Sequence, residues 1–99
     1  MKFYIYKITN INIPEQFYIG STKNFSQRKS KHKKNVYNKR GKLYWCKLYI
    51  YIRSCGGWDN FNIEIIEQGE CNHLLIMKLK EQNMIDLLKP PLNTNNAVC

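Results

Sequence analysis

No stretch of the chain approaches the roughly 18 consecutive apolar residues that a membrane-spanning helix needs. The amino terminus also does not show the charged and then apolar pattern of a signal peptide. These two absences predict an intracellular protein, cytoplasmic or nuclear, with no membrane as its partner. Internal repeats and low-complexity segments are absent too, and 99 residues of which 43% are hydrophobic predict a single folded domain over residues 1–99.

Acidic residues are scarce in the sequence. Only 7 aspartates and glutamates stand against 16 lysines and arginines, so the formal net charge is +9. A surface this basic attracts polyanions by long-range steering and by release of condensed counterions, which makes nucleic acid the expected partner. An acidic membrane surface is the alternative, but the basic residues do not lie on an amphipathic helix with a broad apolar face.

Closely spaced cysteine pairs of the kind that zinc ribbons use do not occur. The four cysteines are Cys46, Cys55, Cys71 and Cys99, and Cys71 has a second possible ligand, His73, close by in sequence. Free thiols are therefore expected. A zinc-stabilised interaction domain that uses the cysteines and His73 is kept as an alternative function.

A β-hairpin is predicted at the start of the chain. Residues 2–8 and 16–20 are rich in β-branched and aromatic side chains, and a turn-like segment separates them. If the hairpin is centred near Asn12, Tyr6 lies directly opposite Tyr18. The two-residue period of a strand then puts both phenols on one face of the sheet.

Three helices and a third strand are predicted after the hairpin, which gives an α+β fold. Asn24 followed by Gln27 resembles a capping box and begins a helix over 25–36. The inward stripe of this helix carries Arg28 and His32 where apolar side chains are expected. The remaining elements are a helix over 43–55 that ends at Gly56-Gly57, a strand over 61–68, and a helix over 72–88 that a proline pair terminates.

The last predicted helix carries an acid within its apolar face. At about 100° per residue, Glu81 falls in the middle of an apolar arc. Burying an unpaired carboxylate costs several kcal/mol, so Glu81 must be protonated, paired or bound to a cation. The arc consists of Leu74, Met77, Met84, Ile85 and Leu88.

Five short motifs follow one another along nearly the whole chain. They are "YIY" at 4–6, "YIG" at 18–20, Arg28 with His32 one turn later, Glu81 on a late helix, and "PPLN" at 90–93. In this order they resemble the motifs of the GIY-YIG nuclease superfamily. One position differs, because Tyr4 stands where the first motif of the family has glycine, which puts the strand geometry there in question.

The resemblance implies a small three-stranded antiparallel sheet flanked by helices, and metal-dependent hydrolysis of DNA phosphodiester bonds. It implies that Glu81 binds one Mg²⁺, which Mn²⁺ can replace, and that Arg28 binds the phosphate. Tyr6 would orient or deprotonate the attacking water, and Tyr18 would help to hold water and phosphate in line. His32 would assist proton transfer, because imidazole titrates near neutrality.

Supporting roles are also expected. Gly20 would let the chain turn tightly and let phosphate approach the backbone, and Asn93 would brace the site. Cleavage of both DNA strands by one small site requires a homodimer or sequential nicking, and a partner protein is another candidate source of specificity. The candidate contacts to the DNA backbone are Lys29, Lys31, Lys33 and Lys34.

Each of these residues also has a purely structural interpretation. Tyr6 and Tyr18 would be core aromatics and His32 a hydrogen-bonded core histidine, whereas Arg28 would be a solvated cation and Glu81 its ion-pair partner, or that of Lys78. The competing function is a catalytically silent DNA-binding module on the same fold. Glu81 separates the two functions, because an acid that faces DNA repels phosphate unless a cation intervenes.

Overall fold

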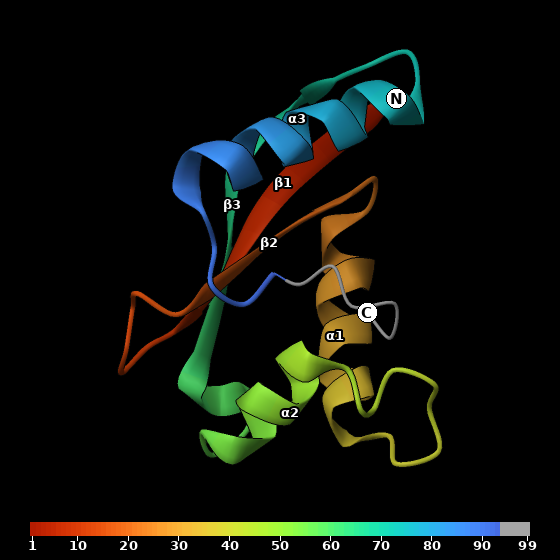
Figure 1. Cartoon of the computed structure of the whole chain (residues 1–99). Helices are drawn as coiled ribbons and strands as arrows, with labels where there is room; N and C mark the ends of the chain where they lie inside the picture. The colour runs from red at the N-terminus through yellow and green to blue at the C-terminus, as the bar shows by residue number, and fades with distance from the viewer. Residues whose placement is uncertain (94–99) are drawn as a thin grey trace.

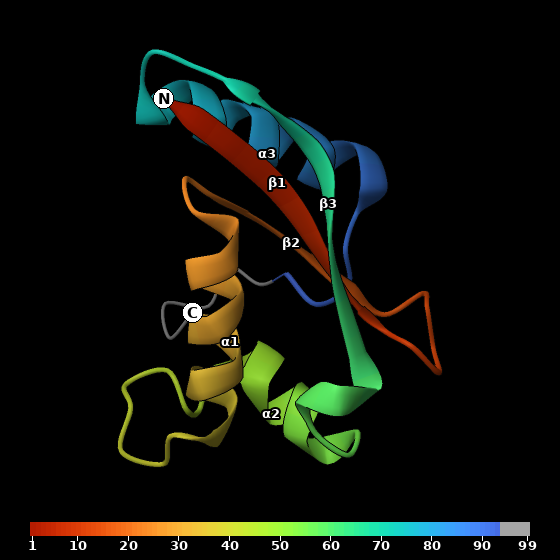
Figure 2. The same cartoon turned by 180° about the vertical axis from the view of Figure 1, so that it is seen from behind.

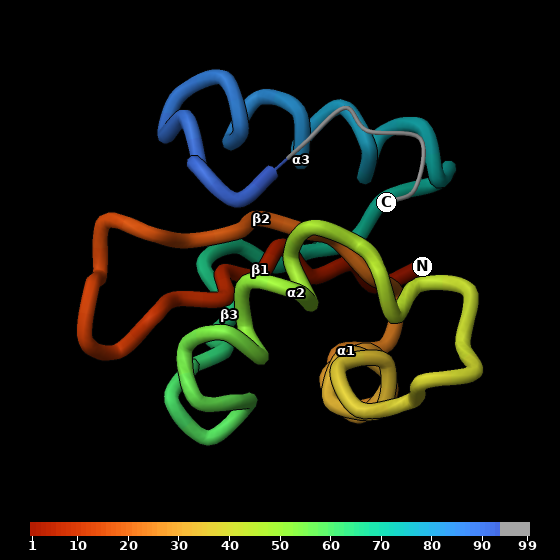
Figure 3. Tube along the Cα trace, turned by 60° about the horizontal axis from the view of Figure 1, so that its bottom comes forward, coloured from red at the N-terminus to blue at the C-terminus, as the bar shows by residue number. Residues whose placement is uncertain are grey.

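The computed structural model describes residues 1–93, which form a sheet with helices on both faces (Figures 1 and 3). The predicted α+β fold, with a three-stranded antiparallel sheet flanked by helices, is confirmed. The elements are β1 (Lys2–Asn10), β2 (Phe17–Thr22), α1 (Phe25–Tyr37), α2 (Lys47–Ser54), the short 3-10 helix η1 (Trp58–Asn60), β3 (Phe61–Glu70) and α3 (Leu74–Leu88).

The sheet has the order β2-β1-β3, so the first strand is central and both neighbours pair with it antiparallel. Alternation along β1 sends Tyr6 and Ile8 into a core shared with α1 and α2, and sends Phe3 and Ile5 into a second core under α3. Figure 2 shows the same sheet from behind, with α3 at the top of the view and α1 and α2 in its lower part. The two edges of the sheet are therefore β2 and β3.

The register of the hairpin differs from the prediction. Tyr6 lies opposite Gly20, and Tyr18 lies opposite Ile8. The hairpin is centred near residue 13 and not near Asn12, because β1 extends to Asn10, whose side-chain oxygen accepts hydrogen bonds from the backbone N–H groups of residues 12 and 13. The offset is two residues, so both phenols still share one face, with their ring centroids 6.4 Å apart.

Gly20 does not end its strand, contrary to the prediction, because β2 continues to Thr22. Nor does Gly20 adopt a positive φ, which among the described glycines only Gly56 and Gly57 do. A Cβ atom at position 20 would instead collide with the hydroxyl of Tyr6 and lie 2.6 Å from its Cζ atom. The glycine is therefore needed to make room for the Tyr6 ring.

Tyr4, which stands in place of the family's glycine, does not disturb β1. It pairs with Thr22 on one side and Gln68 on the other. Its ring lies 6.5 Å from that of Phe25, at the start of α1. The one register shift of β1 falls on the β3 side, between Ile5 and Tyr6.

The helix boundaries are confirmed at some ends and shifted at others. Asn24 caps α1 as predicted, with its side-chain oxygen accepting from the N–H of Gln27. Gly56, with φ of 93°, follows the end of α2 as predicted. However, α2 begins at Lys47 and not at residue 43, because the residues before it form turns. The last helix, α3, begins at Leu74 and not at residue 72, with His73 as its N-cap.

Gly20→Ala is expected to destabilise the protein by about 1–3 kcal/mol, the usual cost of overpacking a filled core. The buried Tyr6 ring cannot move away without losing its partner in α1. Denaturant unfolding measures the change. The control is Gly41→Ala, whose Cβ would meet the end of the Asn38 side chain at 3.0 Å and should change stability by less than about 0.5 kcal/mol. Equal stability of both variants would contradict the packing argument.

Candidate active site

A cleft of about 830 Å³ wraps around the free edge of β2, between α3 on one face of the sheet and α1 and α2 on the other. It collects the predicted catalytic and metal-binding side chains from β1, β2, α1 and α3. The residues of its wall that matter below are Tyr6, Tyr18, Ser21, Arg28, His32, Leu43, Cys46, Tyr49, Lys78, Glu81, Asp86 and Asn93.

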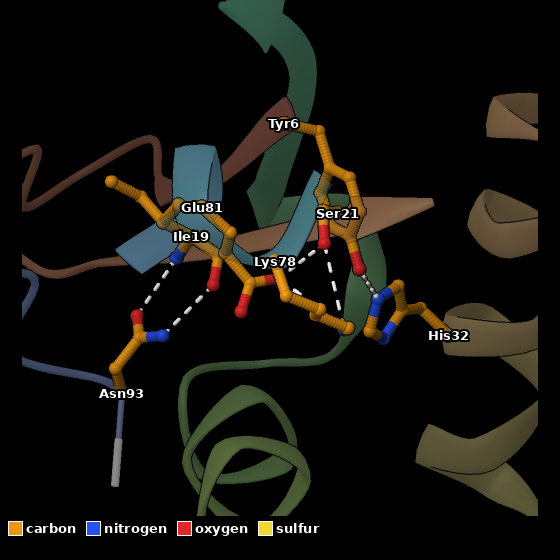
Figure 4. Close-up of polar contacts among 7 residues, drawn as sticks. All are labelled: Tyr6, Ile19, Ser21, His32, Lys78, Glu81 and Asn93. Carbon is orange, nitrogen blue, oxygen red and sulfur yellow. Dashed lines mark hydrogen bonds and ion pairs between the residues drawn. The ribbon is translucent and has the colours of Figure 1, made fainter. Parts of the chain in front are cut away.

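A buried chain of hydrogen bonds starts at the innermost wall of the cleft. The Tyr6 hydroxyl lies 2.7 Å from Nε2 of His32, and the Tyr49 hydroxyl lies 2.7 Å from Nδ1 of the same ring. Asn35 donates to the Tyr49 hydroxyl at 3.4 Å. Figure 4 shows the phenol of Tyr6 directed at the imidazole. Both ring nitrogens of His32 thus have a tyrosine partner.

His32 is uncharged at neutral pH. Burial, followed by the charges of Arg28 and Lys31, lowers the pKa of His32 to about 4. The expectation that this imidazole titrates near neutrality is therefore wrong. A neutral imidazole has one N–H donor and one acceptor nitrogen, so one of its two tyrosine partners donates to it and the other accepts.

Tyr6 and Tyr18 are protonated at neutral pH. Burial raises the pKa of Tyr6 well above its ordinary value, and the neighbouring Tyr18 adds to the shift. Burial and the Glu81 carboxylate raise the pKa of Tyr18 to about 12, although Arg28 acts in the opposite direction. Neither residue is a phenolate near neutral pH, so both can donate as well as accept hydrogen bonds.

Arg28 supplies positive charge to the cleft without a protein partner. Its side chain is half-buried in α1, and within residues 1–93 it makes no hydrogen bond or ion pair. The structural interpretation in which Arg28 forms an ion pair with Glu81 is therefore wrong, because that pair is not present among the described residues. A planar guanidinium held in a cleft with free donors is a suitable binding group for phosphate.

Glu81 lies at the cleft surface and not in an apolar core. Its side chain is 20% exposed, it accepts a hydrogen bond from the Ser21 hydroxyl at 2.5 Å, and Lys78 lies 3.7 Å away (Figure 4). The predicted apolar arc covers it less than expected, because Leu74 and Leu88 at the ends of α3 are 45% and 41% exposed. The predicted ion pair with Lys78 is present, but Lys78 is 59% exposed, so the pair is weak.

Asn93 holds the edge strand beside the tyrosines. Its side chain accepts from the N–H of Ile19 and donates to the C=O of Ile19, both at 2.8 Å (Figure 4). Leu92 adds a backbone hydrogen bond to Phe17 at 3.1 Å. The outward polar groups of β2 between Tyr18 and Gly20 are thereby satisfied, which fixes the position of Tyr18 in the cleft.

The four candidate lysines of α1 are all exposed, but they are not equivalent. Lys31 lines a second hollow of about 340 Å³ that also includes Arg28, Lys23 and Lys78. Lys29, Lys33 and Lys34 line neither hollow.

Sequence reasoning missed three polar residues of the cleft. Ser21 contacts Glu81, Tyr49 contacts His32, and Asp86 is a second carboxylate on the wall, where it accepts from Gln82 at 2.9 Å. Tyr49 was hidden in the nearly continuous apolar segment that includes α2. Tyr49 is 17 positions from His32 in the sequence, and this separation matches no recognisable motif.

The described part of the chain also bears on the expectations for a zinc site and for a membrane span. Residues 1–93 contain no group of three histidine, cysteine or acidic side chains that could hold a metal ion, and Cys55 and Cys71 are free thiols. Cys99 lies outside the described residues. Among the helices of residues 1–93, none has the length and apolar character needed to cross a membrane.

The fold and the cleft together define a small nuclease domain. The family model for the GIY-YIG catalytic domain matches residues 2–96, so the chain belongs to the GIY-YIG family. Membership implies DNA endonuclease activity, with DNA as the substrate.

Two solved structures resemble the chain closely. A glutamate-to-alanine mutant of the catalytic domain of intron endonuclease I-TevI has a TM-score of 0.75 at 25% identity, covering 97% of this chain and 93% of that one. The catalytic domain of homing endonuclease I-TevI has a TM-score of 0.74 at 23% identity, covering 96% of this chain and 97% of that one. A comparison with curated protein sequences gave no significant match.

The pKa of His32 predicts a pH dependence of stability. Between pH 4 and 6.5 the unfolded chain binds a proton at this position and the folded chain does not, so stability rises with pH across this window and is lost as pH falls. Replacing His32 by Gln removes this contribution. The gain in unfolding free energy from pH 4.5 to pH 7 should therefore be smaller in the variant, by on the order of 2 kcal/mol.

Urea unfolding at the two pH values provides this comparison. The carboxylates titrate in both proteins, so they cancel in the difference. An equal gain in wild type and His32→Gln would show that His32 is not held neutral by the fold.

Proposed function

We propose that the cleft hydrolyses DNA phosphodiester bonds with the help of one divalent cation held by Glu81, Mg²⁺ by preference and Mn²⁺ in its place. The observation that supports this most is the presence of two opposite charges in one cleft. The free guanidinium of Arg28 and the accessible carboxylate of Glu81 line the same hollow without binding each other. A site for an anion alone has no use for the acid.

The residues present fit a weakly held magnesium ion. Glu81 uses one carboxylate oxygen for Ser21 and Lys78, and the other oxygen has no hydrogen bond or ion pair within residues 1–93. One carboxylate, completed by water and phosphate oxygens, is an ordinary ligand set for Mg²⁺. When bound, the ion supplies Lewis-acid stabilisation of the scissile phosphate and its leaving oxygen.

Arg28 is proposed to bind the non-bridging oxygens of the phosphate. Its fork of N–H donors matches two oxygens at once, and negative charge accumulates there as the nucleophile attacks. The half-buried setting of the guanidinium strengthens this interaction relative to one in open water. Arg28 thus contributes more to the transition state than to the affinity for DNA.

Tyr6 is proposed to orient the attacking water. Because its raised pKa keeps the phenol protonated, Tyr6 donates its hydrogen to Nε2 of His32 and presents an oxygen lone pair to the water. His32 then directs its Nδ1–H at Tyr49, which selects this tautomer. The raised pKa values favour orientation over removal of a proton by a phenolate. Tyr18 holds water and phosphate in line from the neighbouring strand.

The alternative is a DNA-binding module without catalytic activity. The +9 charge and the exposed lysines suit both functions. Only the nuclease accounts for an acid on a wall that faces a polyanion, because that acid weakens DNA binding unless a cation accompanies it. One site per chain cuts one strand at a time, so double-strand cleavage proceeds by sequential nicking or by two copies acting together.

Cleavage is expected to require a divalent metal and Glu81. Supercoiled, linear and branched DNA should be cut with Mg²⁺ or Mn²⁺ and left intact in excess chelator. Glu81→Gln should fold and bind DNA at least as well as wild type, because a negative charge is removed from the cleft, yet it should not cut. Gel assays of nicked and linear products give the rates.

Glu67→Gln is the matched control for this variant. Glu67 also pairs with a lysine at 3.7 Å, but it lies on β3 away from the cleft, so its loss should leave cleavage unchanged. Cleavage in chelator, or by Glu81→Gln at the wild-type rate, would contradict the proposal. Binding without cleavage by wild type under all metal conditions would favour the silent module.

Arg28 and Tyr6 are expected to act on the transition state as one unit. Arg28→Ala should lower the cleavage rate by about 100- to 1,000-fold, the usual cost of losing a donor aimed at developing charge, with a small loss of affinity. Tyr6→Phe should do likewise, because it removes only the hydroxyl. The double mutant should be scarcely slower than either single mutant.

Single-turnover rates, DNA affinity and thermal midpoint are measured for each variant. Lys34→Ala is the control for a lost positive charge, since Lys34 lies on the same helix but does not line the cleft. Rate losses that merely follow lost stability or lost binding would place both residues outside the catalytic group.

A further inference from the structure

A tryptophan is exposed on the loop between α1 and α2, next to the cleft. Trp45 is 68% exposed, whereas the other tryptophan, Trp58, is 8% exposed in the core. The loop runs at the end of α1 beside the start of α2 (Figures 1 and 3). Its neighbours in sequence, Leu43 and Cys46, line the cleft wall. The loop that carries Trp45 thus contributes to the wall of the cleft.

The loop is held in a way that presents this indole. Arg53 donates from its two terminal nitrogens to the C=O of Val36 at 2.7 Å and of Tyr44 at 2.6 Å. The same guanidinium lies 3.6 Å from the centroid of the Tyr44 ring, and the Tyr44 ring meets Trp45 edge to face at 4.9 Å. The backbone on both sides of the loop is therefore fixed, although the indole itself is in water.

The surroundings of Trp45 are strongly cationic. No aspartate or glutamate occurs between Glu15 and Asp59, a span that holds most of the lysines and arginines of the chain. The exposed cations close to Trp45 in sequence are Lys39, Arg40, Lys42 and Lys47. A flat aromatic ring among cations is the combination that binds a single nucleic-acid strand, where cations hold the phosphates and the ring stacks on a base.

We propose that Trp45 stacks on an unpaired base of the DNA, so that the protein prefers a substrate with a single-stranded segment next to the bond in the cleft. In a duplex both faces of each base are covered by its neighbours, and the ring would have to break that stacking. An unpaired base offers a free face and needs no such disruption. The inference rests on the proposed function, since it gives the substrate class of the same cleft.

The test measures DNA binding in chelator, so that cleavage plays no part. The probes are a forked duplex with one unpaired arm, a single strand, and a fully paired duplex of the same length. Trp58→Phe leaves Trp45 as the only indole, and its fluorescence should be quenched by the fork and the single strand but much less by the duplex. Trp45→Ala should lower affinity for the fork by about five- to 150-fold and affinity for the duplex by less than about twofold.

Two further variants separate stacking from simple contact. Trp45→Phe keeps an aromatic face and should retain most of the preference for the fork, whereas Trp45→Leu keeps only apolar volume and should resemble Trp45→Ala. Leu87→Ala removes an equally exposed side chain, 73% accessible on α3, and should change nothing. The thermal midpoint of all variants should remain close to wild type, because a ring this exposed contributes little to the core.

The outcomes distinguish this inference from the proposed function. Fork and duplex affinities that fall equally in Trp45→Ala, or a Trp45→Leu variant that binds like wild type, would overturn base stacking. If such variants still cut DNA with Mg²⁺, the nuclease proposal stands without it. If the fork preference depends on Trp45 while no metal supports cleavage, the stacking site stands and the nuclease proposal fails.

Discussion

The hydrogen bond between Tyr6 and His32 is the interaction on which the rest of the structure depends. It joins the central strand to α1 at the inner wall of the cleft, where both side chains are almost completely buried. A polar pair at such depth must be fully satisfied, so Tyr49 takes the second imidazole nitrogen, and Gly20 must leave room for the phenol. The strands and the first two helices are therefore arranged around one pair of side chains, and the same burial keeps that pair uncharged.

Charge is distributed unevenly over the molecule, and the distribution matches the position of the cleft. Three acids, Glu64, Glu67 and Glu70, lie on β3, the strand farthest from β2. In α1 and the loop that follows it, all charged residues are lysines and arginines. An approaching polyanion is thus drawn to the side of α1 and α2, toward Arg28. In the cleft, the carboxylate of Glu81 on α3 repels the phosphates that the other charges attract. A DNA-cleaving site tolerates this repulsion only if a cation offsets it.

Much of the fold could be predicted from the sequence, because strand composition, helix caps and the order of the motifs are local properties. Asn24, Gly56 and the α+β order are of this kind. The register of Tyr6 against Gly20 could not be predicted, since it depends on how Asn10 folds the loop back on itself. The motifs also selected residues that meet in one cleft. The protonation state of His32 and the exposure of Glu81 could not be predicted, because both arise only from packing between distant segments.

Asn93 has a consequence for the order of events during synthesis. Tyr6, Tyr18, Arg28 and His32 all precede residue 33, but the backbone of Ile19 in the edge strand β2 is clamped from residue 93. A ribosome therefore releases these groups long before it releases the clamp and Glu81. Until then the free edge of β2 is open to other chains and the cleft has only one of its walls, so the cleft of a nascent polypeptide stays incomplete until residue 93 has been synthesised.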